Sequence, residues 1–561
     1  MSDVLDRFFV QYYKRRPVNA TFTGIHAYDG DLPDWSDVGL WSLDAEMHAL
    51  RAELVASYPA AATDDAHVMR DDVDALDARL AIAFLDIQIA ENASRHGVRG
   101  NPALWSGEAV FSIASLMMRN LESADDLEGR VADRCGGLIT FLADAEDVLR
   151  DAPIPTEWVA KALRDCEGAE LLLTKGIDAW VAERASSPES AENVRIRSEP
   201  ARFAFTRFAE WLRTRKPTRA STMSCGAAMY DLLLSQGHQC TRSRAELLAD
   251  ARAAFAREKA KLAALADSVA GSWENAQIQM ADDRPSPEKY LTAFEATWAR
   301  CHARALEHDV VTWPDWPIRY VPFPAATRDA APYLYYLFYR SPAPFDPYTV
   351  YDYVVPPLPE DPSAAEKHLR GWNQSVITLN HVVHHGAIGH HVQNWHAYHR
   401  ASSRIGKIAA VDCANRVGMF CAGTMAEGWA CYATELMEEL DFLTPLERVS
   451  EQHSRLRFLA RAIVDIELHQ GTMTVDEGVA FYRDKVGMGV DVARAETTKN
   501  AMFPCTAIMY WLGTQGILDL RRDMQAKLGP AFSLKTFHDT LLGYGSIPVP
   551  MVARMMMAEV A

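Results

Sequence analysis

Apolar residues recur every three or four positions along most of this 561-residue chain, which is the repeat of an amphipathic helix. From Val73 onward, Leu76, Leu80, Phe84 and Ile87 would lie on one helix face. Continuous apolar runs of membrane-spanning length are absent from the sequence. The pattern therefore predicts a mainly α-helical fold.

Helix starts are marked by the capping box, in which Ser or Thr is followed three residues later by Glu. Three such pairs are Ser243 with Glu246, Thr444 with Glu447, and Thr474 with Glu477. After the first pair, apolar residues step by seven, at Leu248, Phe255, Leu262 and Val269. A long amphipathic helix is expected there, and further helices are expected after the other two pairs.

One region breaks the helical pattern. Residues 312–359 are rich in proline, which interrupts helices, and in tyrosine, phenylalanine and valine, which favour strands. We expect a small β element here, just before the histidine-rich segment. Either it covers an aromatic core, or one of its strands is an edge that a bound peptide could extend by strand addition.

Charge and composition exclude several classes of protein. The net charge of −18 argues against binding nucleic acid or an anionic membrane. The first residues show no apolar leader, and the nine cysteines are dispersed without a CxxC pair, which favours a cytoplasmic protein with reduced thiols. We expect one compact unit with a helical region at 1–305, a proline- and aromatic-rich region at 306–365 and a helical metal-site region at 366–561.

Histidines are concentrated in one short segment. Seven of the eighteen lie between His381 and His399, and Glu427 follows 36 residues after His391. Imidazole is the commonest protein ligand for zinc, and two histidines with one carboxylate from a second helix form the ligand set of many zinc hydrolases. The segment therefore predicts a metal site that includes Glu427, although Glu427 could instead form a salt bridge.

Several histidine pairs could supply the ligands. On a regular helix, His384 and His391 are seven residues apart and share a face. His381 and His385 form a second pair, at positions i and i+4. The residues alone leave this choice open, and a purely structural cluster of histidines remains the alternative to any metal site.

Residues 384–393, HHGAIGHHVQ, resemble the signature HExxPGHHxQ of the bacterial "domain of unknown function 885" family. Further stretches are similar to that family's motifs: EGWA with Tyr432 and Glu435, Arg461 with Asp465 and His469, and a C-terminal segment from Phe537 to Pro548. The family looks related in turn to the helical zinc carboxypeptidases of the carboxypeptidase Taq type. The resemblance covers nearly the whole chain and is firmest over residues 375–556.

This resemblance implies a zincin-like helical fold with a deep cleft, and zinc held by His384, His390 and Glu427. That assignment requires a helix distorted near Gly386 and Gly389, which glycine tolerates. His391 is the alternate ligand if the helix is regular. The implied substrate is a short peptide or a small amide that carries a free carboxylate.

The chain departs from the family signature at two positions. His385 replaces the glutamate that acts as general base in HExxH peptidases, and Ile388 replaces a proline. His385 or Glu435 could substitute as the base, so ordinary hydrolysis is in doubt. Two rivals stand beside a zinc peptidase: a non-hydrolytic metalloenzyme with iron or another divalent metal, and a metal-binding pseudo-peptidase that only binds.

Other residues are candidates for the same site. Tyr510 could donate a hydrogen bond to an oxyanion, or could be a core tyrosine. His538 could orient neighbouring groups, or could close the packing of a C-terminal helix. The candidates for holding a substrate carboxylate are Arg461, Arg494 and Lys499, each of which could instead form ordinary ion pairs.

Overall fold

The computed structural model describes residues 3–63, 66–118, 126–216, 223–334, 339–340, 343–346, 351–408 and 423–560. Its first part is entirely helical, as the sequence pattern predicts. The elements are α1 (Val4–Arg15), α2 (Pro17–Thr23), η1 (His26–Tyr28), α3 (Asp37–Ser57), η2 (Pro59–Ala62), α4 (Ala66–Asp71), α5 (Val73–Ala93), α6 (Pro102–Met117), α7 (Leu127–Val148), α8 (Thr156–Leu171), η3 (Leu172–Gly176), α9 (Ile177–Arg184) and α10 (Pro188–Thr214).

The middle part leads from helices into a small sheet. Its elements are α11 (Ala227–Leu232), η5 (Leu233–Gly237), α12 (Arg244–Ala270), α13 (Trp273–Asp282), η6 (Pro287–Lys289), α14 (Tyr290–Glu307), β1 (Ile318–Pro322), α15 (Ala325–Arg328), η7 (Ala331–Tyr333), β2 (Tyr339–Arg340), β3 (Tyr351–Val355) and α16 (Pro362–Gly371). The expected β element is therefore present in the proline- and aromatic-rich region.

The last part is again helical and carries the histidine-rich segment. Its elements are α17 (Gln374–Val376), η8 (Ile377–Gly386), α18 (His390–Arg400), α19 (Arg404–Ile408), α20 (Gly423–Glu439), α21 (Pro445–His469), α22 (Val475–Phe481), η10 (Tyr482–Val486), α23 (Val490–Met502), α24 (Met509–Leu528), η11 (Gly529–Ala531), α25 (Leu534–Gly543) and α26 (Val549–Glu559).

The helices begin where the sequence predicts. The capping boxes before α12, α21 and α22 are all formed, with the Ser or Thr oxygen accepting from the backbone N–H three residues on. The helix predicted from Val73 is α5, whose apolar face is buried. These termini are local in origin because each cap satisfies backbone groups of its own first turn.

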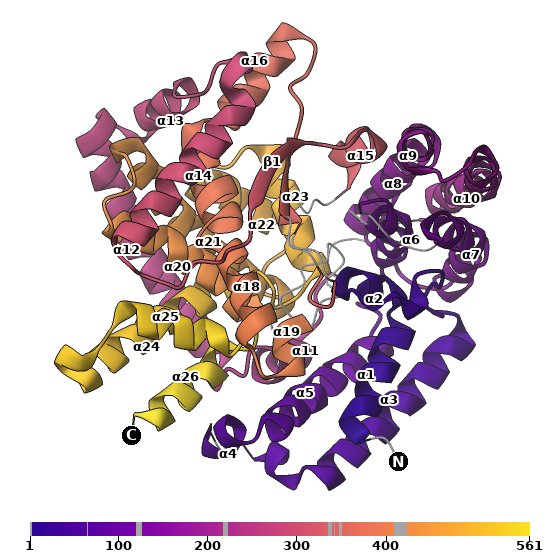
Figure 1. Cartoon of the computed structure of the whole chain (residues 1–561), viewed down its shortest axis with the longest axis horizontal. Helices are drawn as coiled ribbons and strands as arrows, with labels where there is room; N and C mark the ends of the chain where they lie inside the picture. The colour runs from indigo at the N-terminus through magenta and orange to yellow at the C-terminus, as the bar shows by residue number, and fades with distance from the viewer. Residues whose placement is uncertain are drawn as a thin grey trace.

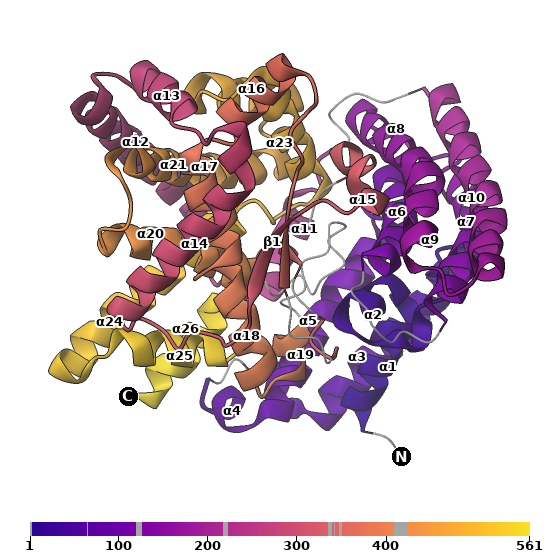
Figure 2. The ribbon, with the colours of Figure 1, turned by 45° about the horizontal axis from the view of Figure 1, so that its top comes forward.

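The sheet has three strands in the order β1-β3-β2, with β1 parallel and β2 antiparallel to the central strand β3. Tyr320 on β1 pairs with Tyr353 on β3, and both rings are buried. Their rings pack against Phe294 of α14, which lies beside the sheet in Figure 2. The sheet therefore encloses an aromatic core, and Tyr353 reaches the histidine-rich segment.

Figure 1 shows the helices α1–α10, in indigo to purple, on one side of the molecule and the elements from α11 onward on the other. The short helix α15, which follows β1, packs against α9 and so bridges the two sides. On the second side α20 lies along α24, and α12 lies along α21. Among the described residues, none of the helices combines the length and apolarity needed to cross a membrane.

Candidate metal centre

The histidine-rich segment forms two helices joined by a sharp break. The first, η8, is a π-helix that ends at Gly386, and α18 begins at His390. The carbonyls exposed by the break are held by indole N–H groups: Trp298 donates to Gly386 at 2.9 Å, and Trp429 donates to Ile388 at 2.9 Å. The break is thus a stable part of the fold, because these two backbone carbonyls have hydrogen-bond donors.

Glycine is required at the end of this break. The N–H of Gly389 donates to the carbonyl of Val383 at 2.9 Å, which folds the chain back onto η8. A Cβ atom at position 389 would overlap the backbone carbonyl of His384, so a residue with a side chain would force the two helices apart. The expected distortion between Gly386 and Gly389 is therefore present.

Three of the predicted ligands meet across this break. Oε2 of Glu427, on α20, lies 3.3 Å from Nε2 of His384 and 3.8 Å from Nε2 of His390. His385 joins the two histidines, since the three rings offer ligand nitrogens within 4.8 Å of one another. His384 is buried and the other three side chains are half-buried.

These side chains fit a divalent transition metal. Oε2 of Glu427 is buried and makes no hydrogen bond with the described residues, which is costly for a carboxylate. Ligand atoms bound at about 2.0–2.1 Å to a tetrahedral zinc stand roughly 3.4 Å apart. The separations of Glu427 from His384 and His390 are close to that value, and two imidazoles with one carboxylate are a suitable donor set.

The charge state of this group also suits a metal. Burial alone would raise the pKa of the Glu427 carboxyl, but the adjacent His384 and the charge of His390 outweigh it and hold that pKa well below its usual range. Burial lowers the pKa of His384. A carboxylate and a neutral imidazole are the protonation states that bind metal.

His385 has a fixed tautomer. Its Nδ1 lies 2.5 Å from the carbonyl oxygen of Asn380, and a carbonyl can only accept, so Nδ1 carries the proton. Nε2 is therefore the basic nitrogen of this ring. Burial, together with the charges of His384 and His390, lowers the pKa of His385 well below its ordinary value.

The other histidines of the segment point elsewhere. Nε2 of His391, the alternate ligand, lies 3.2 Å from the carbonyl oxygen of Trp316, and the ring is buried. His381 stacks on Trp372 with 4.0 Å between ring centroids, and its Nδ1 is hydrogen-bonded to the hydroxyl of Tyr353 at 2.6 Å. The break, rather than a regular helix, thus decides which histidines face Glu427.

Glu435, the predicted catalytic residue on α20, belongs to a separate cluster. Arg455 pairs with it at 3.6 Å, and also pairs with Glu451 and Glu438. Burial raises the pKa of Glu435 to about 7, although the charge of Arg455 opposes this. This carboxyl is therefore engaged by an arginine two helical turns beyond Glu427.

Tyr510 lies on α24 and is buried. Its ring stacks on Phe458 of α21 at 5.2 Å between centroids, and the guanidinium of Arg461 lies 4.6 Å from the ring centroid. Burial, and next the charge of Glu427, raise the pKa of its hydroxyl well above the usual value. The hydroxyl of Tyr510 is thus protonated, and the charge of Glu427 acts on it.

His538 links three segments. Its Nδ1 donates to the carbonyl of Val310 at 2.6 Å, and its Nε2 accepts from the hydroxyl of Tyr432 at 2.8 Å. Burial lowers the pKa of His538 to about 3, so the ring is neutral. This arrangement connects α25 to α20 and to the residues after α14.

The three predicted carboxylate binders have different surroundings. Arg461 donates to both oxygens of Glu496, at 2.7 and 2.9 Å. Arg494 is exposed and lies 3.5 Å from Asp476. Lys499, one turn after Glu496 on α23, makes no ion pair with a described residue.

Sequence reasoning missed Arg457, which is one turn before Arg461 on α21. Its spacing of four from Arg461 could have indicated a shared helix face. Its lack of a partner could not have been read from the sequence. Nε of Arg457 is buried and makes no hydrogen bond among the described residues.

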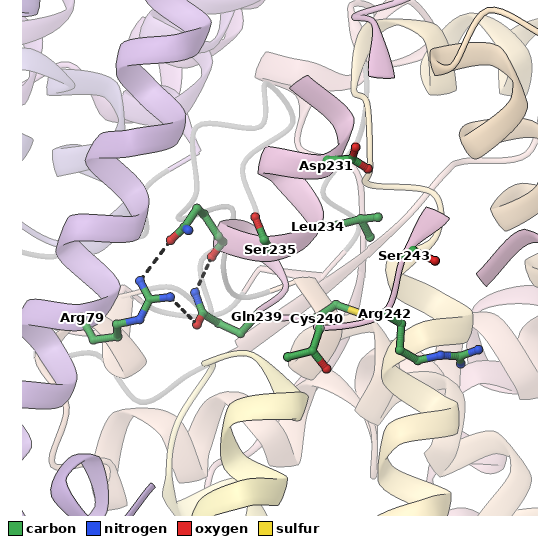
Figure 3. Close-up of a pocket in the computed structure, with 10 residues that line it drawn as sticks. Arg79, Asp231, Leu234, Ser235, Gln239, Cys240, Arg242 and Ser243 are labelled. Carbon is green, nitrogen blue, oxygen red and sulfur yellow. Dashed lines mark hydrogen bonds between the residues drawn. The ribbon is translucent and has the colours of Figure 1, made fainter. Parts of the chain in front are cut away.

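A separate hollow of about 590 Å³ lies near α5 and η5 (Figure 3). Arg79 points across it and donates to Gln236 and Gln239, as the dashed lines show. Arg242, at its rim, pairs with Asp250. None of the residues predicted for the metal site lines this hollow.

Comparison with known proteins places the whole chain in one fold. A structure described as "a putative lipoprotein of unknown function from Shewanella oneidensis" has a TM-score of 0.75 at 19% identity, with 99% of each chain covered. "The putative lipoprotein from Colwellia psychrerythraea" has a TM-score of 0.77 at 16% identity, with 100% of each chain covered. No curated protein matches.

These comparisons correct one expectation. We expected a cytoplasmic protein because the sequence shows no apolar leader and its cysteines are dispersed, but both similar structures are described as lipoproteins, which contradicts that location. Dispersed, reduced cysteines do not by themselves fix a compartment. The family model described as "Bacterial protein of unknown function (DUF885)" matches residues 17–556, and the chain therefore belongs to that family.

Proposed function

We propose that this protein is a zinc-dependent, metallopeptidase-like protein in which His384, His390 and Glu427 hold the metal. The observation that carries the proposal is the approach of Glu427 Oε2 to both imidazole nitrogens while that buried oxygen makes no hydrogen bond among the described residues. Removing a carboxylate from water without a partner is costly, and a divalent cation is the partner that fits this donor set.

The resemblance that we infer between this family and the helical zinc carboxypeptidases supports a zincin-like site in a cleft. It also supports a short peptide, or an amide with a free carboxylate, as the ligand. A zinc ion held here would polarise the carbonyl group of such a ligand. The described surroundings add a protonated donor, Tyr510, beside Glu427.

His385 is our candidate for the proton-accepting group. Its Nδ1–H is held by Asn380, which leaves Nε2 free to accept a proton from water. Glu435, the other candidate, is engaged by Arg455. Imidazole differs from the glutamate of related sites in charge and reach, so we propose that peptide hydrolysis is slow.

A second function follows from the same substitution. With His385 in place of the glutamate, the protein could hold zinc and capture peptides without cleaving them, as a pseudo-peptidase. Two histidines and one carboxylate also suit iron in a non-hydrolytic metalloenzyme. Metal identity separates iron from zinc, and turnover separates an enzyme from a binding protein.

The test is metal analysis followed by turnover. Chelator-washed protein is offered zinc or iron(II), freed of unbound metal, and analysed by mass spectrometry beside His384→Ala and the exposed control His399→Ala. We expect about one zinc per chain in the wild type and the control, and little in His384→Ala. Equal zinc in all three proteins would overturn the ligand set. Cleavage of a mixed di- to octapeptide pool then distinguishes the enzyme from the pseudo-peptidase.

A further inference from the structure

Positive charge exceeds negative charge beside the candidate metal centre. Arg457 and Arg461 lie four residues apart on one face of α21, and Lys499 lies on α23 with the carboxylate of Glu496. All four side chains are half-buried. Of these three cations, only Arg461 forms an ion pair with a described residue, Glu496. The place is partly desolvated, and there an unbalanced charge is more costly than at the surface.

The carboxylate of Glu496 is committed to Arg461. The Nε and Nη2 atoms of Arg461 donate to the two oxygens of Glu496 in a fork-to-fork pair. The charge of Arg461 accordingly helps to hold the pKa of Glu496 at about 2, against the effect of burial. Arg461 therefore has a fixed orientation, and the edge of its guanidinium that carries Nε and Nη2 is closed to a ligand.

Arg457 is in the opposite situation. It makes no hydrogen bond or ion pair with the described residues, and its Nε is buried without a partner. Its guanidinium is 5.6 Å from the ring centroid of Phe458. Burial and the neighbouring charge of Arg461 lower the pKa of Arg457, although the charge of Glu496 opposes this. An anion that entered here would gain a charged donor already stripped of much of its water.

Tyr510 lies between the surroundings of Arg457 and those of Glu427. The ring of Tyr510 packs flat on Phe458 and under Arg461, and the charge of Glu427 acts on its hydroxyl. Cys431 is one turn beyond Glu427 on α20, and it is among the groups whose charge affects the pKa of Arg457.

We propose that Arg457 anchors the free carboxylate of the ligand, and that the pair of Arg461 with Glu496 positions the ring of Tyr510 beside it. This inference rests on the proposed function and names the determinant of its substrate class. It replaces Arg461 and Arg494 as direct carboxylate ligands, because Glu496 occupies the first and the second is exposed. Lys499 adds positive charge without a described partner.

The test compares ligands that differ only in the carboxylate. Zinc-loaded full-length protein is titrated calorimetrically with Ala-Ala-Phe as the free acid and as the C-terminal amide. A charged hydrogen bond contributes roughly 10- to 100-fold in affinity, so the wild type should prefer the acid by that factor. Arg457→Gln should lose most of the preference, while the exposed control Arg483→Gln should keep it.

Each contrary result overturns the inference. These are an absence of free-acid binding at millimolar concentration, equal affinity for acid and amide in the wild type, or an undiminished preference in Arg457→Gln. Competition by inorganic phosphate as strong as by the peptide acid would show a general anion site instead. Arg457→Lys, which keeps a charge but loses the fork, should show an intermediate preference, and this guards against misfolding of the Gln variant.

Metal content keeps this test separate from the test of the proposed function. Arg457→Gln should bind as much zinc as the wild type, because Arg457 is not one of the three proposed ligands. If the wild type holds no zinc, the proposed function fails, and the acid-to-amide comparison on metal-free protein still judges Arg457. If zinc binds normally but the acid preference is missing, the proposal for Arg457 alone fails.

Discussion

The hydroxyl of Tyr353 and Nδ1 of His381 share a hydrogen bond of 2.6 Å that ties the central strand of the sheet to the π-helix η8. It brings the aromatic region into contact with the histidine-rich segment, as the order of the two in the sequence suggests. The rings of Tyr353 and His385 are also 6.0 Å apart. The sheet therefore supports the helix that carries His384.

Removing this hydroxyl should weaken the support. Tyr353→Phe leaves a buried imidazole nitrogen without its bond, and we expect a loss of about 1–3 kcal/mol in the free energy of unfolding. Urea unfolding of the metal-free protein measures it. The matched control is Tyr320→Phe, the neighbour of Tyr353 in register, whose buried hydroxyl has no partner among the described residues. That control should be neutral or stabilising, and equal losses in both variants would contradict the prediction.

Glu427→Gln should release the metal while preserving the fold. The amide has the shape of the carboxylate but lacks its charge, so we expect zinc affinity to fall at least about 100-fold. Competition with a fluorescent chelator measures the affinity. Glu439→Gln, on the same helix, is the control because Glu439 pairs with Arg521 instead. Unchanged affinity in Glu427→Gln would remove Glu427 from the ligand set.

His385→Glu should raise the rate of peptide hydrolysis. A carboxylate would stand one residue after His384, where related sites hold their general base, and such bases contribute roughly 10²- to 10⁴-fold. We expect a gain of about 10- to 100-fold, because Ile388 still differs from the family proline. Initial rates on a di- to octapeptide pool measure it, with His399→Glu as the surface control. Brisk cleavage by the wild type would mean that a base is already in place and would rule out the pseudo-peptidase.

His538 should make the protein sensitive to acid. The pKa of this histidine is lowered to about 3 in the fold, against about 6.5 in the unfolded chain. Between these values the unfolded state binds the additional proton, so stability is present above pH 6.5 and is lost as the pH falls towards 3. This histidine alone contributes a slope of up to about 1.4 kcal/mol per pH unit.

His538→Asn should reduce that slope, because the amide can still donate to the carbonyl of Val310 but does not titrate. Urea unfolding between pH 6 and pH 4 measures the slope directly. The control is His48→Asn, which replaces an exposed histidine and should leave the slope unchanged. A slope in His538→Asn as steep as in the wild type would assign the acid sensitivity to other buried histidines, such as His238 or His453.

Local features of this fold could be predicted from the sequence because their causes are local. The helices after Ser243, Thr444 and Thr474 begin at their caps, since each capping box satisfies its own first turn. The short strands between residues 312 and 359 could be predicted because proline interrupts helices there and aromatic residues favour strands. The parallel register of β1 with β3 could not be predicted, because it depends on packing against α14.

The candidate site shows the same limit. The family signature led to His384, His390 and Glu427, which the structure brings together, but a regular helix would have favoured His391. The surroundings of Glu435 and Arg461 were not predictable, since Arg455 and Glu496 reach them from elsewhere. Arg457 was missed because its lack of an acidic partner among the described residues depends on which side chains lie around it in space. The sequence does not show those neighbours.

The break before His390 has a consequence for how such sites change over time. Gly389 sets the separation of two ligands through the backbone, without supplying a ligand itself. Replacing one of the proposed ligands would change one bond to the proposed metal, whereas replacing this glycine would separate His384 from His390 at once. A single substitution at position 389 could therefore abolish the proposed site in a lineage that no longer needs a metal, even though His384, His385, His390 and Glu427 would all remain in the sequence.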